Sequence, residues 1–167
     1  MMTTEFERDP VREFLESAKE AKLEIARHRE RVEELESRCT RMTANMSATP
    51  GGGNSDAQQL WVALAEERDK ELAAEKRELE KYHAVESFIN RVPGEMQRTI
   101  LRMRYLRLLR WVPIQMELYK KGIVYCEREI FRIHGEALES VRELWRKEHG
   151  GGDAYEVPAE STSEVLH

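Results

Sequence analysis

The sequence predicts an all-α protein, with a long helical hairpin followed by a smaller helical unit. Charged residues make up 35% of the 167 residues and aromatic residues only 7%, a balance typical of long helices. Apolar residues recur at helical spacing, and no stretch shows a convincing alternation of apolar and polar residues, as a half-buried strand would. Glycine and proline gather in a few clusters that divide the chain into segments.

The first predicted helix covers residues 11–42 and carries a regular heptad. Asp9 and Pro10 supply an N-cap and a first-turn proline. Apolar residues at alternating four- and three-residue spacing form a stripe that must pack on another helix. His28 lies in this stripe, and we interpret it as a seam residue because no metal-binding cluster accompanies it. The stripe is Val11, Phe14, Ala18, Ala21, Ile25, His28, Val32, Leu35, Cys39 and Met42.

A Gly-rich loop near residues 47–56 separates this helix from a second one, predicted at residues 57–90. Ser55 or Asp56 can cap the second helix. Because the two helices have nearly equal length and a short connection, we predict that residues 11–90 form an antiparallel coiled-coil hairpin. A homodimer through the same stripe is the competing arrangement, and it can also add to the hairpin. The apolar positions of the second helix are Trp61, Leu64, Ala65, Leu72, Leu79, Tyr82 and Ile89, interrupted by Arg68 and Glu75.

Residues 95–149 are predicted to form a second unit with helices at 95–109, 112–121 and 126–148. Pro93 and Gly94 end the hairpin. Gly122 can adopt the left-handed conformation that ends the middle helix. Residues 1–10 are predicted to be an N-terminal tail and residues 150–167 a disordered C-terminal tail. The last helix has a core stripe of Ile130, Ile133, Ala137, Leu138, Val141 and Leu144.

The charge is divided unevenly between the two units. The whole chain carries −5, but residues 91–148 hold 13 Lys and Arg against 8 Asp and Glu. Such asymmetry indicates a basic functional half beside an acidic helper half. The basic run can contact phosphates, or it can form a solvated face or pair with the acidic hairpin. Its members are Arg98, Arg102, Arg104, Arg107 and Arg110.

The last two helices indicate a helix-turn-helix that binds double-stranded DNA. In such a unit the start of the second helix enters the major groove. Arg128 and Arg132 lie four residues apart on the exposed side, and either guanidinium can bind guanine through two hydrogen bonds. Lysines and an arginine nearby would contact phosphates. The candidate DNA-binding residues are Arg110, Lys120, Lys121, Tyr125, Glu127, Arg128, Phe131 and Arg132.

Two residues of this segment have two interpretations each, and a third has one. Glu127 either accepts a hydrogen bond from a cytosine amine or, as we prefer, favours the positive end of its helix. Phe131 either touches a thymine methyl group or packs against the hairpin. Cys126, at the cap position, is interpreted as structural because no neighbouring base would activate its thiol.

The basic unit resembles the C-terminal module of RinA/ArpU-like phage transcriptional regulators, which is similar to region four of bacterial sigma factors. The likeness is carried by Arg104-Tyr105-Leu106, by Trp111 and by the run at 126–138. The loop at 49–56, after a long charged helix, resembles the N-terminal half of a related prophage family. These resemblances imply a regulator of phage or prophage late genes that acts at promoters beside host RNA polymerase. The connection from Leu118 to Cys126 is longer than the turn usual in such modules.

Two other function classes remain as alternatives. One is a phage small terminase-like subunit for DNA packaging, and the other is a helical interaction protein that binds host RNA polymerase without touching DNA. An enzyme is not expected, since no phosphate-cradling glycine motif, Cys-His pair or spaced carboxylates stand out. No cofactor and no metal site are expected. Without a signal segment or a run long enough to span a bilayer, we expect a soluble, cytoplasmic protein.

Overall fold

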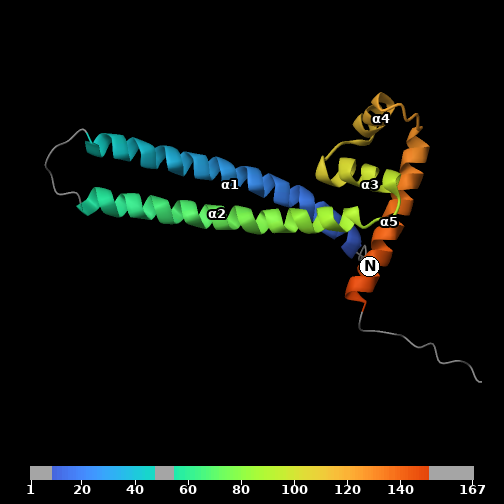
Figure 1. The fold of residues 1–167 in the computed structure, drawn as a ribbon, viewed down its shortest axis with the longest axis horizontal. Helices are drawn as coiled ribbons and strands as arrows, with labels where there is room; N and C mark the ends of the chain where they lie inside the picture. The colour runs from blue at the N-terminus through green and yellow to red at the C-terminus, as the bar shows by residue number, and fades with distance from the viewer. Residues whose placement is uncertain (1–8, 48–54, 151–167) are drawn as a thin grey trace, which may run out of the picture.

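The computed structural model of the protein describes residues 9–47 and 55–150, and within these ranges the all-α prediction is confirmed. Two long helices lie side by side and antiparallel, and the shorter helices gather at one end of this hairpin (Figure 1). The predicted tails and loop, over residues 1–8, 48–54 and 151–167, lie outside the described residues. The elements are α1 (Pro10–Ser47), α2 (Ser55–Asn90), α3 (Glu95–Leu101), a π-helical turn η1 (Arg102–Leu106), α4 (Trp111–Lys120) and α5 (Glu127–His149).

Helix α1 turns its predicted heptad toward α2. The Oδ1 atom of Asp9 accepts a hydrogen bond from the Val11 amide at 3.1 Å, which caps the start of the helix. Every heptad position from Val11 to Met42 is buried or half-buried. This continuous apolar stripe explains why 38 residues form one helix.

Helix α2 buries or half-buries five of its seven predicted apolar positions, namely Leu64, Ala65, Leu79, Tyr82 and Ile89. Trp61 and Leu72, expected in the seam, remain 44% and 42% exposed. Glutamates of α2 occupy the facing positions in the middle of the hairpin, where they meet cations of α1. Two ion pairs cross the seam, Arg31–Glu67 at 2.9 Å and Arg29–Glu75 at 2.7 Å, and Nδ1 of His28 lies 2.5 Å from a carboxylate oxygen of Glu71.

The helix predicted at residues 95–109 ends earlier than expected. After η1 the chain leaves the helix at Leu108, which has a φ of +59°, a left-handed conformation that is uncommon for a leucine. The Nζ atom of Lys22, on α1, donates to the carbonyl of Leu106 at 3.1 Å, so the hairpin caps the end of η1. The Leu109 amide donates to the Met103 carbonyl at 2.9 Å. These bonds hold the break that precedes α4.

Two apolar cores share α5. The base core joins the base of the hairpin to η1 and to the second half of α5, and Phe14, Phe88 and Trp145 pack there with ring centroids 5.0–5.9 Å apart. An ion pair from Arg142 to Asp9 at 2.6 Å closes its edge. The three-helix core joins α3, η1, α4 and the first half of α5, through Ile100, Met103, Ile114, Leu118, Ile130 and Ile133. Helix α5, together with α3 and η1, thus connects the candidate site to the hairpin.

Within the described ranges, none of the helices is both long enough and apolar enough to cross a membrane.

Candidate nucleic-acid interface

The candidate site is built on the start of α5. Cys126 is its N-cap residue, and its carbonyl accepts hydrogen bonds from the amides of Glu129 and Ile130, both at 3.1 Å. The Cys126 side chain makes no capping bond. Glu127 and Glu129 lie in the first turn, where carboxylates are favoured by the positive end of the helix dipole. This arrangement agrees with a local structural role for Glu127.

The outer face of α5 presents arginines and one aromatic ring to solvent. Arg128 is exposed and has no ion-pair partner among residues 9–47 and 55–150. Arg132 is exposed too, and its guanidinium pairs with Glu136 one turn further on. The Phe131 ring packs edge-on against Trp111 at 4.9 Å and remains 41% exposed. Phe131 therefore packs on α4, an arrangement the sequence did not suggest.

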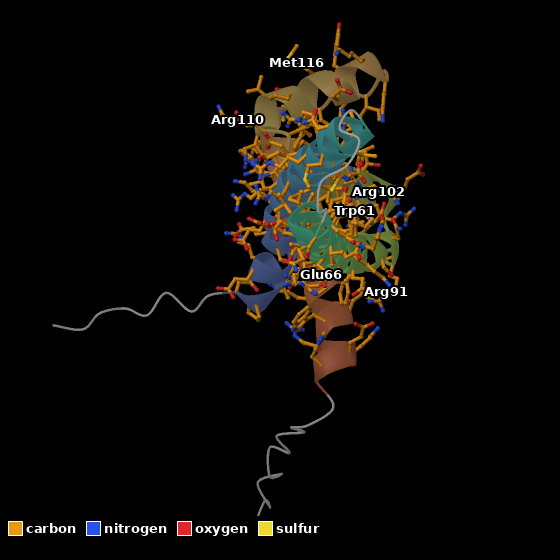
Figure 2. All side chains as sticks on the ribbon, turned by 90° about the vertical axis from the view of Figure 1, so that its left-hand side faces the viewer. Trp61, Glu66, Arg91, Arg102, Arg110 and Met116 are labelled. Carbon is orange, nitrogen blue, oxygen red and sulfur yellow. The ribbon has the colours of Figure 1, made fainter. Side chains whose placement is uncertain are left out.

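The predicted phosphate-binding cations stand at opposite ends of α4. Arg110 is exposed at the N-cap position, and Lys120 and Lys121 are exposed at the C-terminal end. Figure 2, which looks along the hairpin, shows Arg110 next to α4. A ten-residue helix is about 15 Å long. Arg110 is therefore separated from the two lysines by about the length of α4, and the three cations do not form one cluster.

Tyr125 lies apart from the outer face of α5. Its ring is half-buried and packs against the three-helix core. Its carbonyl accepts a hydrogen bond from Nε2 of Gln115 at 2.9 Å, which fastens the segment before α5 to α4. The structure thus places Tyr125 where it positions α5.

Three members of the arginine run donate hydrogen bonds to other groups of the protein. Arg98 donates to the carbonyls of Val92 and Pro93, and Arg102 donates to the Asn90 side chain. Arg104 donates to the Leu109 carbonyl at 3.1 Å, and its guanidinium lies 4.7 Å from the Trp111 ring centroid. Most of these partners lie within seven residues of the arginine along the chain, and the side chains bond to the ends of neighbouring helices.

His134 is a buried residue that sequence reasoning missed. It is 8% exposed, and its Nε2 lies 3.1 Å from the hydroxyl of Tyr105. Trp111 packs edge-on against its ring at 4.9 Å. Burial, with the charges of Arg12 and Arg104, lowers the pKa of His134 to about 4, so the ring is neutral near pH 7. Its position one residue after Ile133, in the stripe of α5, was the signal available.

Acidic residues of α1 face part of the interface. A cleft lies between α1 and the connection from η1 to α4, and Glu16 and Glu20 line it together with Arg104 and Arg110. Lys19 of α1 lines the cleft as well, so carboxylates and cations both surround it. DNA that approached this edge would meet both signs of charge, whereas Arg128 stands apart from that cleft.

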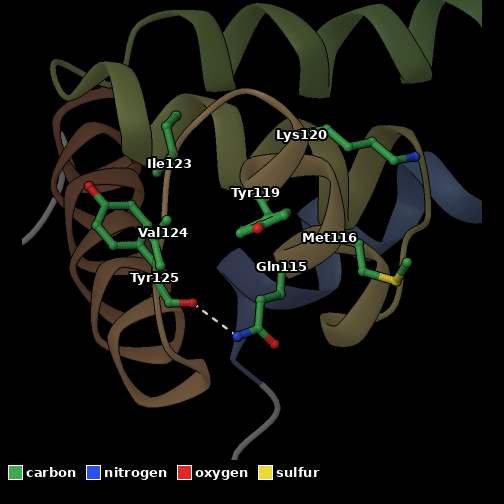
Figure 3. A pocket seen from close by; sticks show the side chains of 7 residues that line it. All are labelled: Gln115, Met116, Tyr119, Lys120, Ile123, Val124 and Tyr125. Atoms are coloured by element: carbon green, nitrogen blue, oxygen red, sulfur yellow. Dashed lines mark hydrogen bonds between the residues drawn. The ribbon is translucent and has the colours of Figure 1, made fainter.

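A groove beside the start of α5 was also missed by sequence reasoning. It has a volume of about 300 Å³ and lies between the outer face of α4 and the segment leading into α5 (Figure 3). Met116, Tyr119 and Val124 are 57%, 69% and 76% exposed. Over the described residues, no group of three or more His, Cys, Asp or Glu side chains is arranged to hold a metal ion.

Comparison with known proteins finds no family model, no curated protein and no solved structure that matches this chain.

Proposed function

We propose that this protein is a sequence-specific DNA-binding regulator of transcription, of the phage or prophage type that the resemblance implies. The observation that carries the proposal is the outer face of α5, where exposed Arg128 and Arg132 stand in the first two turns of a helix backed by its own apolar core. Helix-turn-helix proteins place this part of the second helix in the major groove. In this proposal α4 and α5 form the helix-turn-helix and the hairpin is the helper unit.

Arg128 and Arg132 are the proposed base readers. Arg128 has no internal partner to give up within the described chain, whereas Arg132 must exchange Glu136 for a base. Each guanidinium would bind a guanine edge through two hydrogen bonds. Arg110, Lys120 and Lys121 would contact phosphates on either side.

The test begins with selection of DNA sites by the full chain from a random duplex pool, followed by titration of the selected site. Arg128→Ala and Arg132→Ala should each weaken binding to that site by ~1–3 kcal/mol and relax the preference at one base. Lys121→Ala should weaken binding to all sequences alike and lower the salt slope by about 1. Arg27→Ala, a 73% exposed cation of the hairpin, is the matched control and should change nothing.

Glu136→Gln gives an independent test in the opposite direction. Removing this carboxylate frees Arg132 and removes a negative charge beside the proposed DNA surface. Binding to the selected site should therefore become tighter. Equal, weak binding to every duplex by all of these variants would contradict sequence-specific recognition.

The oligomeric state separates this proposal from a packaging subunit. We propose a monomer or a dimer through the hairpin, and sedimentation equilibrium of the full chain measures it directly. A ring of about eight copies or more would instead favour the small terminase-like function. Binding to RNA polymerase is a further proposed property, tested by pull-down with purified polymerase in the absence of DNA.

A further inference from the structure

The groove on α4 combines apolar side chains with an open backbone edge. Gln115, Met116, Tyr119 and Lys120 line it from α4, and Ile123, Val124 and Tyr125 line it from the following segment (Figure 3). Its volume of about 300 Å³ has room for one or two large side chains. Exposed apolar residues gathered in one hollow are typical of a site that another molecule covers.

The backbone from residue 123 to residue 126 runs without a helical turn. The Ile123 amide donates to the Leu118 carbonyl at 3.0 Å, and the Tyr125 carbonyl accepts from Gln115, so both residues turn their polar groups toward α4. The N–H and C=O of Val124 have no hydrogen-bond partner in the described parts of the chain.

The charged rim of the groove is basic. Lys120 is the charged residue of its lining, and Lys121 follows with no ion-pair partner within the described ranges. Glu117 is the nearest carboxylate along α4, and Lys120 and Arg107 hold it, with Lys120 the main cause of its lowered pKa. The rim complements an acidic partner.

We propose that this groove binds an extended peptide segment of a partner protein, which adds as a strand beside Val124. One apolar side chain of that segment fills the pocket between Met116 and Tyr119, and acidic residues lie beside Lys120 and Lys121. Strand addition gives affinity through main-chain hydrogen bonds and specificity through pockets for alternate side chains. A helical partner would leave the Val124 groups unpaired, and a phosphate backbone gains nothing from the apolar lining. This inference does not depend on the proposed DNA binding.

The probe for the test is the peptide acetyl-Asp-Asp-Leu-Thr-Phe-Thr-Leu-Asp-amide, titrated into the ¹⁵N-labelled full chain. Chemical-shift changes should centre on Val124 and its neighbours, and the Val124 amide should become protected from hydrogen exchange. Two further peptides carry an N-methyl group on the phenylalanine amide or on the next threonine amide. Alternate residues of the bound strand face opposite sides, so only one of the two amides bonds to the protein. The peptide methylated at that amide should bind about fivefold more weakly than the probe, which corresponds to the loss of one hydrogen bond, and the other should bind as the probe does.

Variants on the exposed face of α4 separate the groove from its surroundings. Met116→Glu and Tyr119→Asp place a charge in the groove and should abolish binding of the probe. Val112→Glu makes a comparable change on the same helix, where Val112 is 64% exposed and outside the groove, and should bind as the unchanged protein does. Thermal melts confirm that each variant is folded.

A charge exchange tests the basic rim. Lys120→Glu with Lys121→Glu should weaken the acidic probe and strengthen a peptide in which lysines replace its aspartates. The proposal is overturned if the shifts map elsewhere, if neither or both N-methylated peptides lose affinity, or if a helical peptide of the same composition binds better. It is also overturned if Tyr119→Asp lowers the solution mass, because the groove would then be a contact between copies of this chain.

Discussion

In the middle of the hairpin, glutamates of α2 meet cations of α1, whereas the core beneath α4 and α5 is apolar. Arg31 and Glu67, for example, keep 39% and 46% of their side chains exposed. Such solvated pairs contribute about 0–1 kcal/mol. Full burial of one isoleucine or leucine contributes about 1.5–3 kcal/mol. The comparison teaches that the exposed ion pairs of the hairpin contribute little stability beside the buried apolar residues.

The largest expected effect comes from the three-helix core. Ile130→Ala, at a residue only 1% exposed, should lower the free energy of unfolding by ~2–5 kcal/mol because it leaves a cavity. Glu75→Ala, which breaks the pair with Arg29 across the hairpin, should cost under about 1 kcal/mol. Urea denaturation followed by circular dichroism measures both. Equal losses from the two changes would remove the contrast between the regions.

Lowering the pH should reduce the free energy of unfolding through the buried His134 of α5. Its pKa of about 4 in the folded protein lies below the ordinary value of 6.5, so the unfolded chain takes up a proton first as the pH falls. Stability is therefore present above about pH 6.5 and is lost progressively down to pH 4, by roughly 3 kcal/mol. His134→Gln, which can still bond Tyr105, should flatten this pH dependence. Unfolding curves between pH 4 and 7 show whether the loss persists in the variant.

Replacing the polar pair in the hairpin seam with apolar residues should raise the free energy of unfolding, by less than the losses expected from Ile130→Ala and from lowering the pH. His28 and Glu71 are 21% and 25% exposed and pair with each other. His28→Leu combined with Glu71→Leu should raise stability by about 1 kcal/mol, because a half-buried pair costs desolvation that apolar side chains avoid. Either single change leaves one polar group unpaired and should lower stability. A double change that destabilises the protein would show that the seam contributes more than alignment.

The smallest effects should come from two glycines near the candidate site. Gly122 has a φ of +80°, so Gly122→Ala should cost about 1 kcal/mol. Gly135 lies inside α5 with open space around it, so Gly135→Ala should add ~0.5–1 kcal/mol. Differential scanning calorimetry resolves the opposite signs. If Gly135→Ala also weakens DNA binding, the outer face of α5 is in close contact with DNA.

The sequence predicted buried faces best in helices whose apolar residues recur at regular helical spacing. The heptad of α1 and the stripe of α5 follow from apolar spacing, so their buried faces could be predicted. In α2 the same reasoning also placed Trp61 and Leu72 in the seam, because the contact of Glu71 with His28 on the opposite helix cannot be read from the sequence of α2 alone. Apolar periodicity records burial, and it misses positions where charges are paired across a seam.

The candidate site shows the same limit in another form. The exposure of Arg128 and Arg132 follows from their spacing relative to Ile130 and Ile133. The engagement of Arg104 with Trp111, and the place of Tyr125 on the three-helix core, depend on residues that meet only after folding. The groove beside Val124 depends on the path of a segment that carries no periodic signal.

Because α5 packs in both cores, a change in its tilt is expected to move the hairpin with it. Helix α1 has 38 residues and is therefore about 57 Å long. A change of one degree in the tilt of α5 moves the far end of the hairpin by about 1 Å at this length. The orientation of α5 on a bound target thus determines where the far end of the hairpin lies. A second molecule that binds this end would distinguish one orientation from another.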